Sequence, residues 1–113
     1  MSKLRIAFPT KGYDGLDETI SEVFGKAKTL TLVDVEDGRI LDVTVIENPG
    51  ASLDQGSGPL AVKLLADGNV DLVMAVEIGP GASSLIKHHG MKIVKVDGNK
   101  RISEIIRELN KII

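Results

Sequence analysis

The sequence predicts an α/β fold in which a mixed five-stranded sheet is flanked by three main helices. Two observations support this prediction. Short apolar runs alternate with helix-like patterns in the second half of the chain, and an Asp-Gly turn joins two β-branched runs in the first half. A length of 113 residues suits one compact unit with its own core. We therefore interpret residues 1–113 as a single domain.

The first half predicts three strands. Asp-Gly between β-branched runs is a strong hairpin signal, because the turn needs positive φ and glycine supplies it. In the second hairpin strand, Leu41, Val43 and Val45 alternate with polar residues, which indicates one more buried face. The predicted elements are a strand over Lys3–Pro9, a loop over Thr10–Asp17, a short turn at 21–25 that anchors Phe24, and hairpin strands over Lys28–Val35 and Arg39–Glu47.

The second half predicts three helices and two strands. Apolar residues recur at helical spacing in three segments, and the segment from Ile102 to Ile112 is the clearest amphipathic stripe in the chain. Gly68 and Gly90 are the expected stops of the first two helices. The predicted elements are helices over Gly58–Asp67, over Ala82–His89 and from Ile102, with strands over Asp71–Val76 and Met91–Val96.

Composition excludes several classes of function. Fourteen Lys and Arg against 16 Asp and Glu give a net charge of −2, without the basic excess on which general nucleic-acid binding depends. The absence of cysteine excludes disulfides, a catalytic thiol and thiolate metal ligands. No stretch approaches the roughly 20 apolar residues of a membrane span, and the start lacks a signal-peptide pattern. We expect a cytoplasmic protein without a nucleic-acid or membrane partner.

The predicted connections bring several loops to one edge of the sheet. Right-handed crossovers make the last two strands parallel, whereas the hairpin makes the second strand antiparallel. The carboxyl ends of the other four strands then emerge together. Gly79-Pro80-Gly81 lies there, at the start of the second helix, where free N–H groups and the helix dipole favour an anion. A tight strand-to-helix connection without a ligand is the alternative interpretation.

The long loop at 48–59 supplies further candidates. Its polar residues can fold over a ligand, with Ser57 capping the next helix, or they can form a solvated connection. Lys11 and Lys26 can neutralise an anion at the same edge, although surface lysines are common without such a role. The candidate binding residues are Lys26, Asn48, Gln55, Gly56, Gly58, Gly79, Pro80 and Gly81.

Histidines and carboxylates give weaker candidates. His88 and His89 are adjacent in a helix and cannot easily share a metal, so we expect packing or capping roles, with His89 on the apolar stripe. Glu22, Glu47 and Glu77 can converge as an acidic or metal site, which leaves a metal-dependent hydrolase open.

Four segments in order resemble one protein family. They are SEVFGKAKTLTLVDVEDG at 21–38, ENPG with QGSG at 47–58, LLADGNVDLVMAVEIGPGA at 64–82 and HGMKIVKV at 89–96. Together they are similar to the dinitrogenase iron–molybdenum cofactor biosynthesis family, of the NifX and NifB carboxy-terminal type. The resemblance implies a ribonuclease-H-like fold and the binding of an anionic iron–molybdenum cofactor or iron–sulfur precursor.

The sequence also departs from this family. Its turn often reads SEHFGRA, whereas Val23 and Lys26 stand here, and Gln55 holds a place that often carries histidine. Valine cannot ligate a metal and an amide is a poor ligand for iron, so direct ligation loses support. We therefore expect a non-enzymatic carrier with a small anionic cofactor and a protein recipient as partners. A ligand-free interaction module is the alternative, ahead of the hydrolase.

Overall fold

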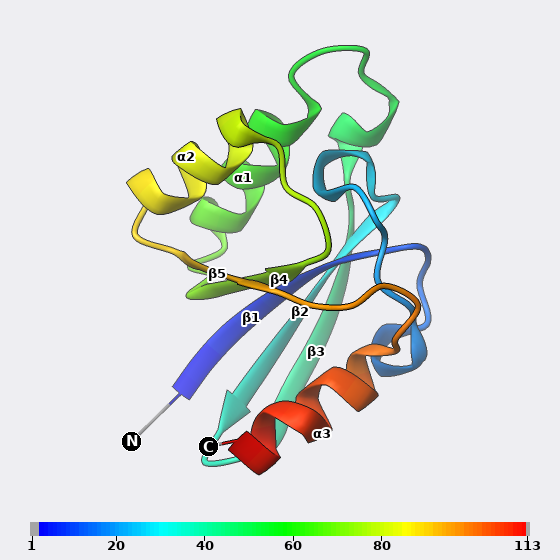
Figure 1. The fold of residues 1–113 in the computed structure, drawn as a ribbon, viewed down its shortest axis with the longest axis vertical. Helices are drawn as coiled ribbons and strands as arrows, with labels where there is room; N and C mark the ends of the chain where they lie inside the picture. Colours follow the sequence, from blue (N-terminus) through cyan, green and yellow to red (C-terminus); the bar gives the residue numbers. More distant parts are fainter. Residues whose placement is uncertain (1–2, 113) are drawn as a thin grey trace.

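The computed structural model describes residues 3–112 of the predicted single domain and contains one mixed five-stranded sheet (Figure 1). The strand order is β3-β2-β1-β4-β5. Antiparallel pairing joins β1 to β2 and β2 to β3, whereas β1–β4 and β4–β5 are parallel, as the crossover argument predicts. The strands are β1 (Lys3–Thr10), β2 (Thr29–Glu36), β3 (Arg39–Glu47), β4 (Leu72–Ala75) and β5 (Lys92–Lys95).

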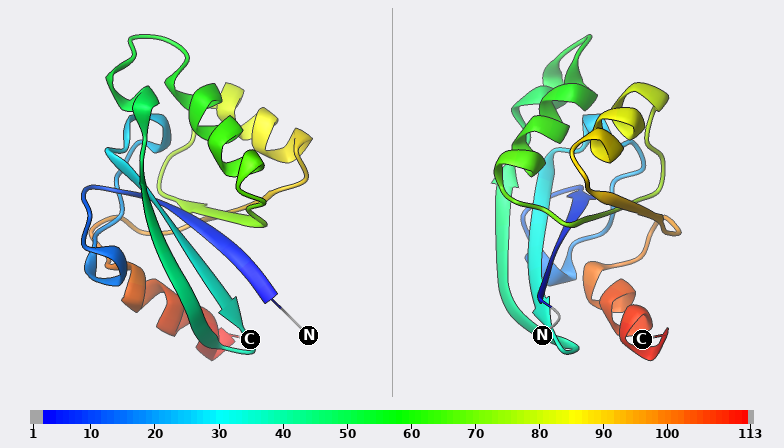
Figure 2. Two further views of the ribbon diagram at one scale, coloured as in Figure 1. Left: turned by 180° about the vertical axis from the view of Figure 1, so that it is seen from behind. Right: turned by 90° about the vertical axis from the view of Figure 1, so that its left-hand side faces the viewer.

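Helices cover both faces of the sheet, as the views in Figure 2 show. The helices α1 (Ser57–Asp67) and α2 (Pro80–His88) pack on one face, where Ala7 and Val73 belong to their apolar core. The helix α3 (Ile102–Ile112) covers the other face and packs with Ile6 and Phe8. Three helices flanking a mixed sheet are therefore confirmed. No helix among the described residues is long and apolar enough to cross a membrane.

The hairpin turn has the predicted chemistry. Asp37 has φ of 52° and Gly38 has φ of 81°, so both central residues adopt the positive values that a two-residue hairpin turn demands. The burial of β3 is only partly as predicted, because the pairing register shifts by one residue between Asp34 and Val35. Leu41 has no partner at this irregularity and is 49% exposed, whereas Val43 is partly buried.

Glycines follow the first two helices as predicted. The helix α1 ends at Asp67, just before Gly68, and the residue with positive φ is the next one, Asn69. After α2, the N–H groups of Gly90 and Met91 donate to Lys87 O and Ile86 O, and Gly90 has φ of 81°. This arrangement is a Schellman motif, which turns the chain back and buries Met91. The prediction that His89 continues the apolar stripe is therefore wrong, because His89 is exposed.

Two helix starts differ from the prediction. The helix α2 begins at Pro80, two residues before the predicted Ala82, because proline is well suited to the first helical position. The helix α1 begins at Ser57, with Gly56 in the capping position and no side-chain capping bond. The predicted cap at Ser57 is wrong, since Ser57 already lies inside the helix. The strand limits agree with the predictions to within one residue at each end.

An ion pair links β1 to β2. Arg5 Nε donates to Asp34 Oδ1 at 2.8 Å, Arg5 Nη2 donates to Asp34 Oδ2 at 3.1 Å, and Arg5 Nη1 donates to Gly68 O at 2.6 Å. The hydrogen bond from Arg5 lowers the pKa of Asp34, although burial opposes the shift. The pair thus ties the end of α1 to the sheet.

This ion pair predicts a loss of stability in acid. Since the folded pKa of Asp34 is lowered, the contribution is present above the unfolded pKa near 4 and is lost as the pH falls through the folded value. We expect Asp34→Asn to cost about 1 kcal/mol at neutral pH, because Arg5 is 36% exposed and water screens the pair. Urea unfolding between about pH 6 and pH 2 should show a flatter profile for Asp34→Asn than for the exposed control Asp54→Asn. Equal profiles would contradict this assignment.

Candidate functional site

Four segments meet where the strands β1, β3 and β4 end (Figure 1). They are the short helix η2 (Phe24–Lys26), the short helix η3 (Pro49–Ser52), the start of α1 and the start of α2. We call this set of segments the loop edge. It contains all the candidate binding residues, either within these elements or in the loop residues next to them.

The helix η2 is fastened to the connection between β4 and α2. Phe24 N donates to Glu77 O at 3.1 Å, and Glu77 N donates to Glu22 O at 3.1 Å. Val23 and Glu77 form a parallel bridge. The Phe24 side chain is 1% exposed and packs in the core beneath α1 and α2, which confirms the predicted anchoring turn. The core and the backbone together fix the position of this segment.

Asn48 joins η2 to η3. Its Nδ2 donates to Gly25 O at 3.2 Å and to Ala27 O at 2.9 Å, while its Oδ1 accepts from Gly50 N at 3.2 Å. The residue is 5% exposed. Because both amide hydrogens and the amide oxygen already have partners, Asn48 positions the loop edge rather than offering a free amide to a ligand.

Glycines allow the segments to approach closely. A Cβ added to Gly25 would lie 2.8 Å from Gly58 N and 2.9 Å from Gly58 Cα, while one added to Gly58 would lie 3.2 Å from the Ala82 Cβ. The starts of α1 and α2 therefore lie against each other, with η2 against α1. Gly58 serves this packing, which is a different role from the predicted ligand contact.

Gly79 and Gly81, unlike Gly25 and Gly58, have no close neighbours. A Cβ added to either residue would meet nothing within 4 Å. Gly79 has φ of −63° and ψ of 159°, a conformation open to any residue, and Gly81 lies in the first turn of α2. The N–H groups of Gly81 and Ala82 have no acceptor among residues 3–112, and Pro80 has no N–H. These groups can accept hydrogen-bond partners from outside the chain.

The loop at 53–56 is held by one lysine. Lys26 Nζ donates to Leu53 O, and Leu53 N donates to Gly50 O at 3.0 Å. Gln55 is exposed and has no hydrogen-bond partner among the described residues. Gly56 has φ of 80°, which favours glycine, and its added Cβ would also meet open space. Lys26 and Gln55 thus lie at the surface of the loop edge.

The predicted acidic cluster does not form. Glu47 accepts a hydrogen bond from Tyr13 Oη at 3.1 Å, whereas Glu22 and Glu77 meet through their backbones. Within residues 3–109, no three His, Asp or Glu side chains are grouped so that they could hold a metal ion. The carboxylate convergence on which the hydrolase alternative rests is therefore missing from this part of the chain.

The histidines lie at the opposite end of α2 from Gly79. Their ring centroids are 5.5 Å apart with the rings nearly perpendicular, and both side chains are exposed. At a rise of 1.5 Å per residue, the nine residues of α2 separate its two ends by about 12 Å. His88 and His89 therefore do not contribute to the loop edge.

Sequence reasoning missed the close approach at Gly25. The only available signal was a glycine inside a short turn, which does not reveal what lies opposite. It also missed Tyr13, whose hydroxyl group binds Glu47 while Lys28 Nζ lies 5.4 Å from its ring centroid. For Asn48, an asparagine before Pro-Gly is a recognisable turn signal, and its side chain caps η3.

Comparison with known proteins gives a consistent family signal. Residues 2–112 match the family model described as dinitrogenase iron-molybdenum cofactor. An uncharacterized protein of Methanocaldococcus jannaschii is 28% identical over 94 residues, which are 83% of this chain and 75% of that protein.

Solved structures share the fold. An NMR structure from Thermotoga, provisionally described as a NifB protein, is 30% identical with a TM-score of 0.78, and the match covers 96% of this chain and 88% of that one. The apo form of the orange protein from Desulfovibrio gigas is 22% identical with a TM-score of 0.85, covering 95% of this chain and 87% of that one.

Proposed function

Because this chain belongs to the dinitrogenase iron–molybdenum cofactor family, we propose that it is a small carrier of an anionic iron–molybdenum cofactor or iron–sulfur precursor, bound at the loop edge. The contacts come from the backbone of Gly79, Pro80 and Gly81, and from Lys26 and Gln55 beside them. Asn48 holds η2 and η3 together, Gly58 lets the start of α1 lie against the start of α2, and Gly56 lets the loop approach. The carrier is not an enzyme, and it passes its cargo to a recipient protein.

The observation that carries this proposal is the open space at Gly79 and Gly81. Glycine in a helix costs about 0.5–1 kcal/mol relative to alanine, and neither backbone angle nor packing inside the chain requires it at Gly81. Gly79 holds the capping position before α2, where glycine is well tolerated but not required. A ligand that approaches the backbone closely gives both glycines a role. The free N–H groups of Gly81 and Ala82 and the positive end of the α2 dipole favour an anion there.

The available side chains define the class of cargo. The chain has no cysteine, Met74 and Met91 are buried in the core, and the histidines lie at the far end of α2. The loop edge therefore offers hydrogen-bond donors and one ammonium group rather than soft metal ligands. This donor set fits a preassembled metal–sulfur anion whose metals already have their ligands. It does not fit a bare iron ion, which would need ligands from the protein.

The overall fold is also consistent with this proposal. The sheet and helices that carry the loop edge have the same arrangement as in the similar Thermotoga protein and in the apo form of the orange protein. We propose further that this mixed sheet, with helices on both faces, is of the ribonuclease-H-like type.

Titration with a metal–sulfur anion whose metal already has all its ligands tests the carrier function. We expect tetrathiomolybdate, added anaerobically, to bind saturably and to shift the amide signals of Gly79, Gly81 and Gln55. Molybdate has the same charge but harder oxygen atoms, so it serves as the matched control and should bind more weakly. Absence of saturation up to about 1 mM, or shifts confined to other parts of the sheet, would refute binding at the loop edge.

A further inference from the structure

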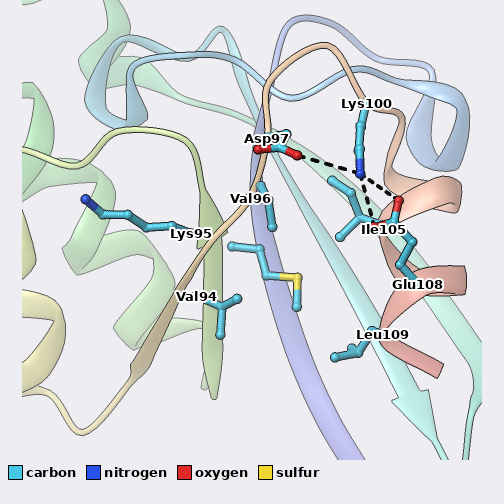
Figure 3. A pocket seen from close by; sticks show the side chains of 9 residues that line it. Val94, Lys95, Val96, Asp97, Lys100, Ile105, Glu108 and Leu109 are labelled. Atoms are coloured by element: carbon cyan, nitrogen blue, oxygen red, sulfur yellow. Dashed lines mark hydrogen bonds and ion pairs between the residues drawn. The ribbon is translucent and has the colours of Figure 1, made fainter. Parts of the chain in front are cut away.

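A cavity of about 240 Å³ lies between β5 and α3, on the sheet face opposite α1 and α2 (Figure 3). Its apolar walls come from β4, β5 and α3, and its rim is charged. We call this cavity, with the free edge of β5, the β5–α3 groove. The lining residues are Met74, Val94, Lys95, Val96, Asp97, Lys100, Ile105, Glu108 and Leu109.

The backbone of β5 offers unpaired groups beside this cavity. Within residues 3–112 the strand is the last in the sheet and pairs only with β4. Lys92 N donates to Asp71 O and Val96 N donates to Ala75 O, both at 3.0 Å, so these residues face β4. Since backbone groups alternate in direction along a strand, Ile93 and Lys95 direct their N–H and C=O groups away from the sheet. An added strand can pair with them.

The apolar part of the groove is incompletely covered. Val94 is 41% exposed, although its side chain points to the face that α3 covers. In Figure 3, Val94, Val96 and Leu109 surround the hollow, whereas Lys95 extends away from it. An apolar side chain opposite Val94 on an added strand would enter this hollow, because directly opposed residues share a sheet face.

The charges of β5 favour an acidic occupant. Lys100 Nζ lies 2.7 Å from Glu108 Oε1 and 3.9 Å from Asp97 Oδ2, so these two carboxylates exceed its charge by one. Lys92 and Lys95 are exposed at the two ends of β5 and have no ion pair among the described residues. The uncompensated charge on the strand itself is therefore positive, whereas the rim at Lys100 keeps one net negative charge.

We propose that the β5–α3 groove binds an extended acidic segment of a partner protein by strand addition. The segment places carboxylates opposite Lys92 and Lys95 and an apolar side chain opposite Val94. A second copy of this chain supplies no carboxylate to these lysines. The antiparallel register that pairs Ile93 with Lys95 of the copy sets Val94 against Val94 of the copy and Lys92 against its Val96. This proposal does not depend on the cofactor, since it rests on residues outside the loop edge.

Short peptides test this proposal directly. The probe has a Glu-Val-Leu-Glu core. In either strand direction this core places glutamates opposite Lys92 and Lys95 and an apolar residue opposite Val94. The control peptide has a Lys-Val-Leu-Lys core. We expect the acidic peptide to shift amide signals in β5 and α3 and to bind about tenfold more tightly than the control. The double variant Lys92→Glu with Lys95→Glu should reverse this preference.

The matched control makes the same charge change elsewhere. Lys63→Glu with Lys87→Glu alters two exposed lysines on α1 and α2 and should keep the preference for the acidic peptide. Thermal unfolding of both double variants establishes that they are folded. If Lys92 and Lys95 only protect a free strand edge from aggregation, neither peptide will bind at about 2 mM. That result, equal binding of both peptides, or shifts only at the loop edge would overturn the proposal.

Discussion

Replacing Gly25 with alanine is expected to lower the free energy of unfolding by about 3 kcal/mol. The added Cβ would lie 2.8 Å from Gly58 N and 2.9 Å from Gly58 Cα, which is closer than real contacts of this kind. Both neighbouring atoms belong to the backbone, so no side chain can rotate away. Either η2 or the start of α1 must shift, and overpacking in a well-ordered region costs energy of this size.

Gly81→Ala is the matched control for this effect. It is the same chemical change, but the added methyl group meets open space in the first turn of α2. We expect Gly81→Ala to raise the free energy of unfolding by about 0.5 kcal/mol, because alanine favours helix. Urea unfolding of both variants measures the contrast. A small effect at Gly25 comparable to that at Gly81 would show that η2 is not held against α1.

The regular parts of this fold could be predicted because their signals are local. Asp37-Gly38 specifies a hairpin through backbone angles that only a few residues adopt, and the structure has those angles. The spacing of Ile102, Ile105 and Ile106 predicts a helix with one apolar face, and all three are buried beneath the sheet. Each pattern lies within a few residues of chain, so no knowledge of distant neighbours is needed.

The contacts of the loop edge could not be predicted in the same way. The closeness of Gly25 to Gly58 joins residues that lie more than 30 positions apart, and the amide of Asn48 reaches back to Ala27. The sequence indicates that such residues belong to turns, but not which turns meet. Lys26 was a candidate for anion binding by its charge and its expected place at this edge, whereas its contact with Leu53 O depends on the folded loop.

His89 illustrates how one local pattern can override another. Its spacing from Ala82, Leu85 and Ile86 predicts a place on the apolar face of α2, but the helix ends at His88. Two hydrogen bonds back into the last turn then give the inward position to Met91, which is 4% exposed. Gly90 was the correct signal for the end of the helix, whereas the apolar periodicity predicted a helix that was one residue too long.

Gly81→Glu is expected to weaken binding of tetrathiomolybdate by about tenfold or more while leaving the protein at least as stable. A carboxylate at the start of α2 interacts favourably with the helix dipole, and replacing glycine there reduces the entropy cost of folding. The same carboxylate would stand beside the free N–H groups of Gly81 and Ala82. Repulsion between it and a bound anion about 5 Å away costs about 1–3 kcal/mol at surface dielectric values.

In Gly81→Glu, weaker binding of the anion without a loss of stability would separate a binding role of Gly81 from a structural one. Lys87→Gln makes the same change in net charge at the other end of α2, so it controls for long-range electrostatics and should alter binding little. Isothermal titration with each variant gives the affinities, and urea unfolding gives the stabilities. If Gly81→Glu binds the thioanion as tightly as the unchanged protein does, the anion does not sit at the start of α2. The open glycines would then belong to a connection without a ligand.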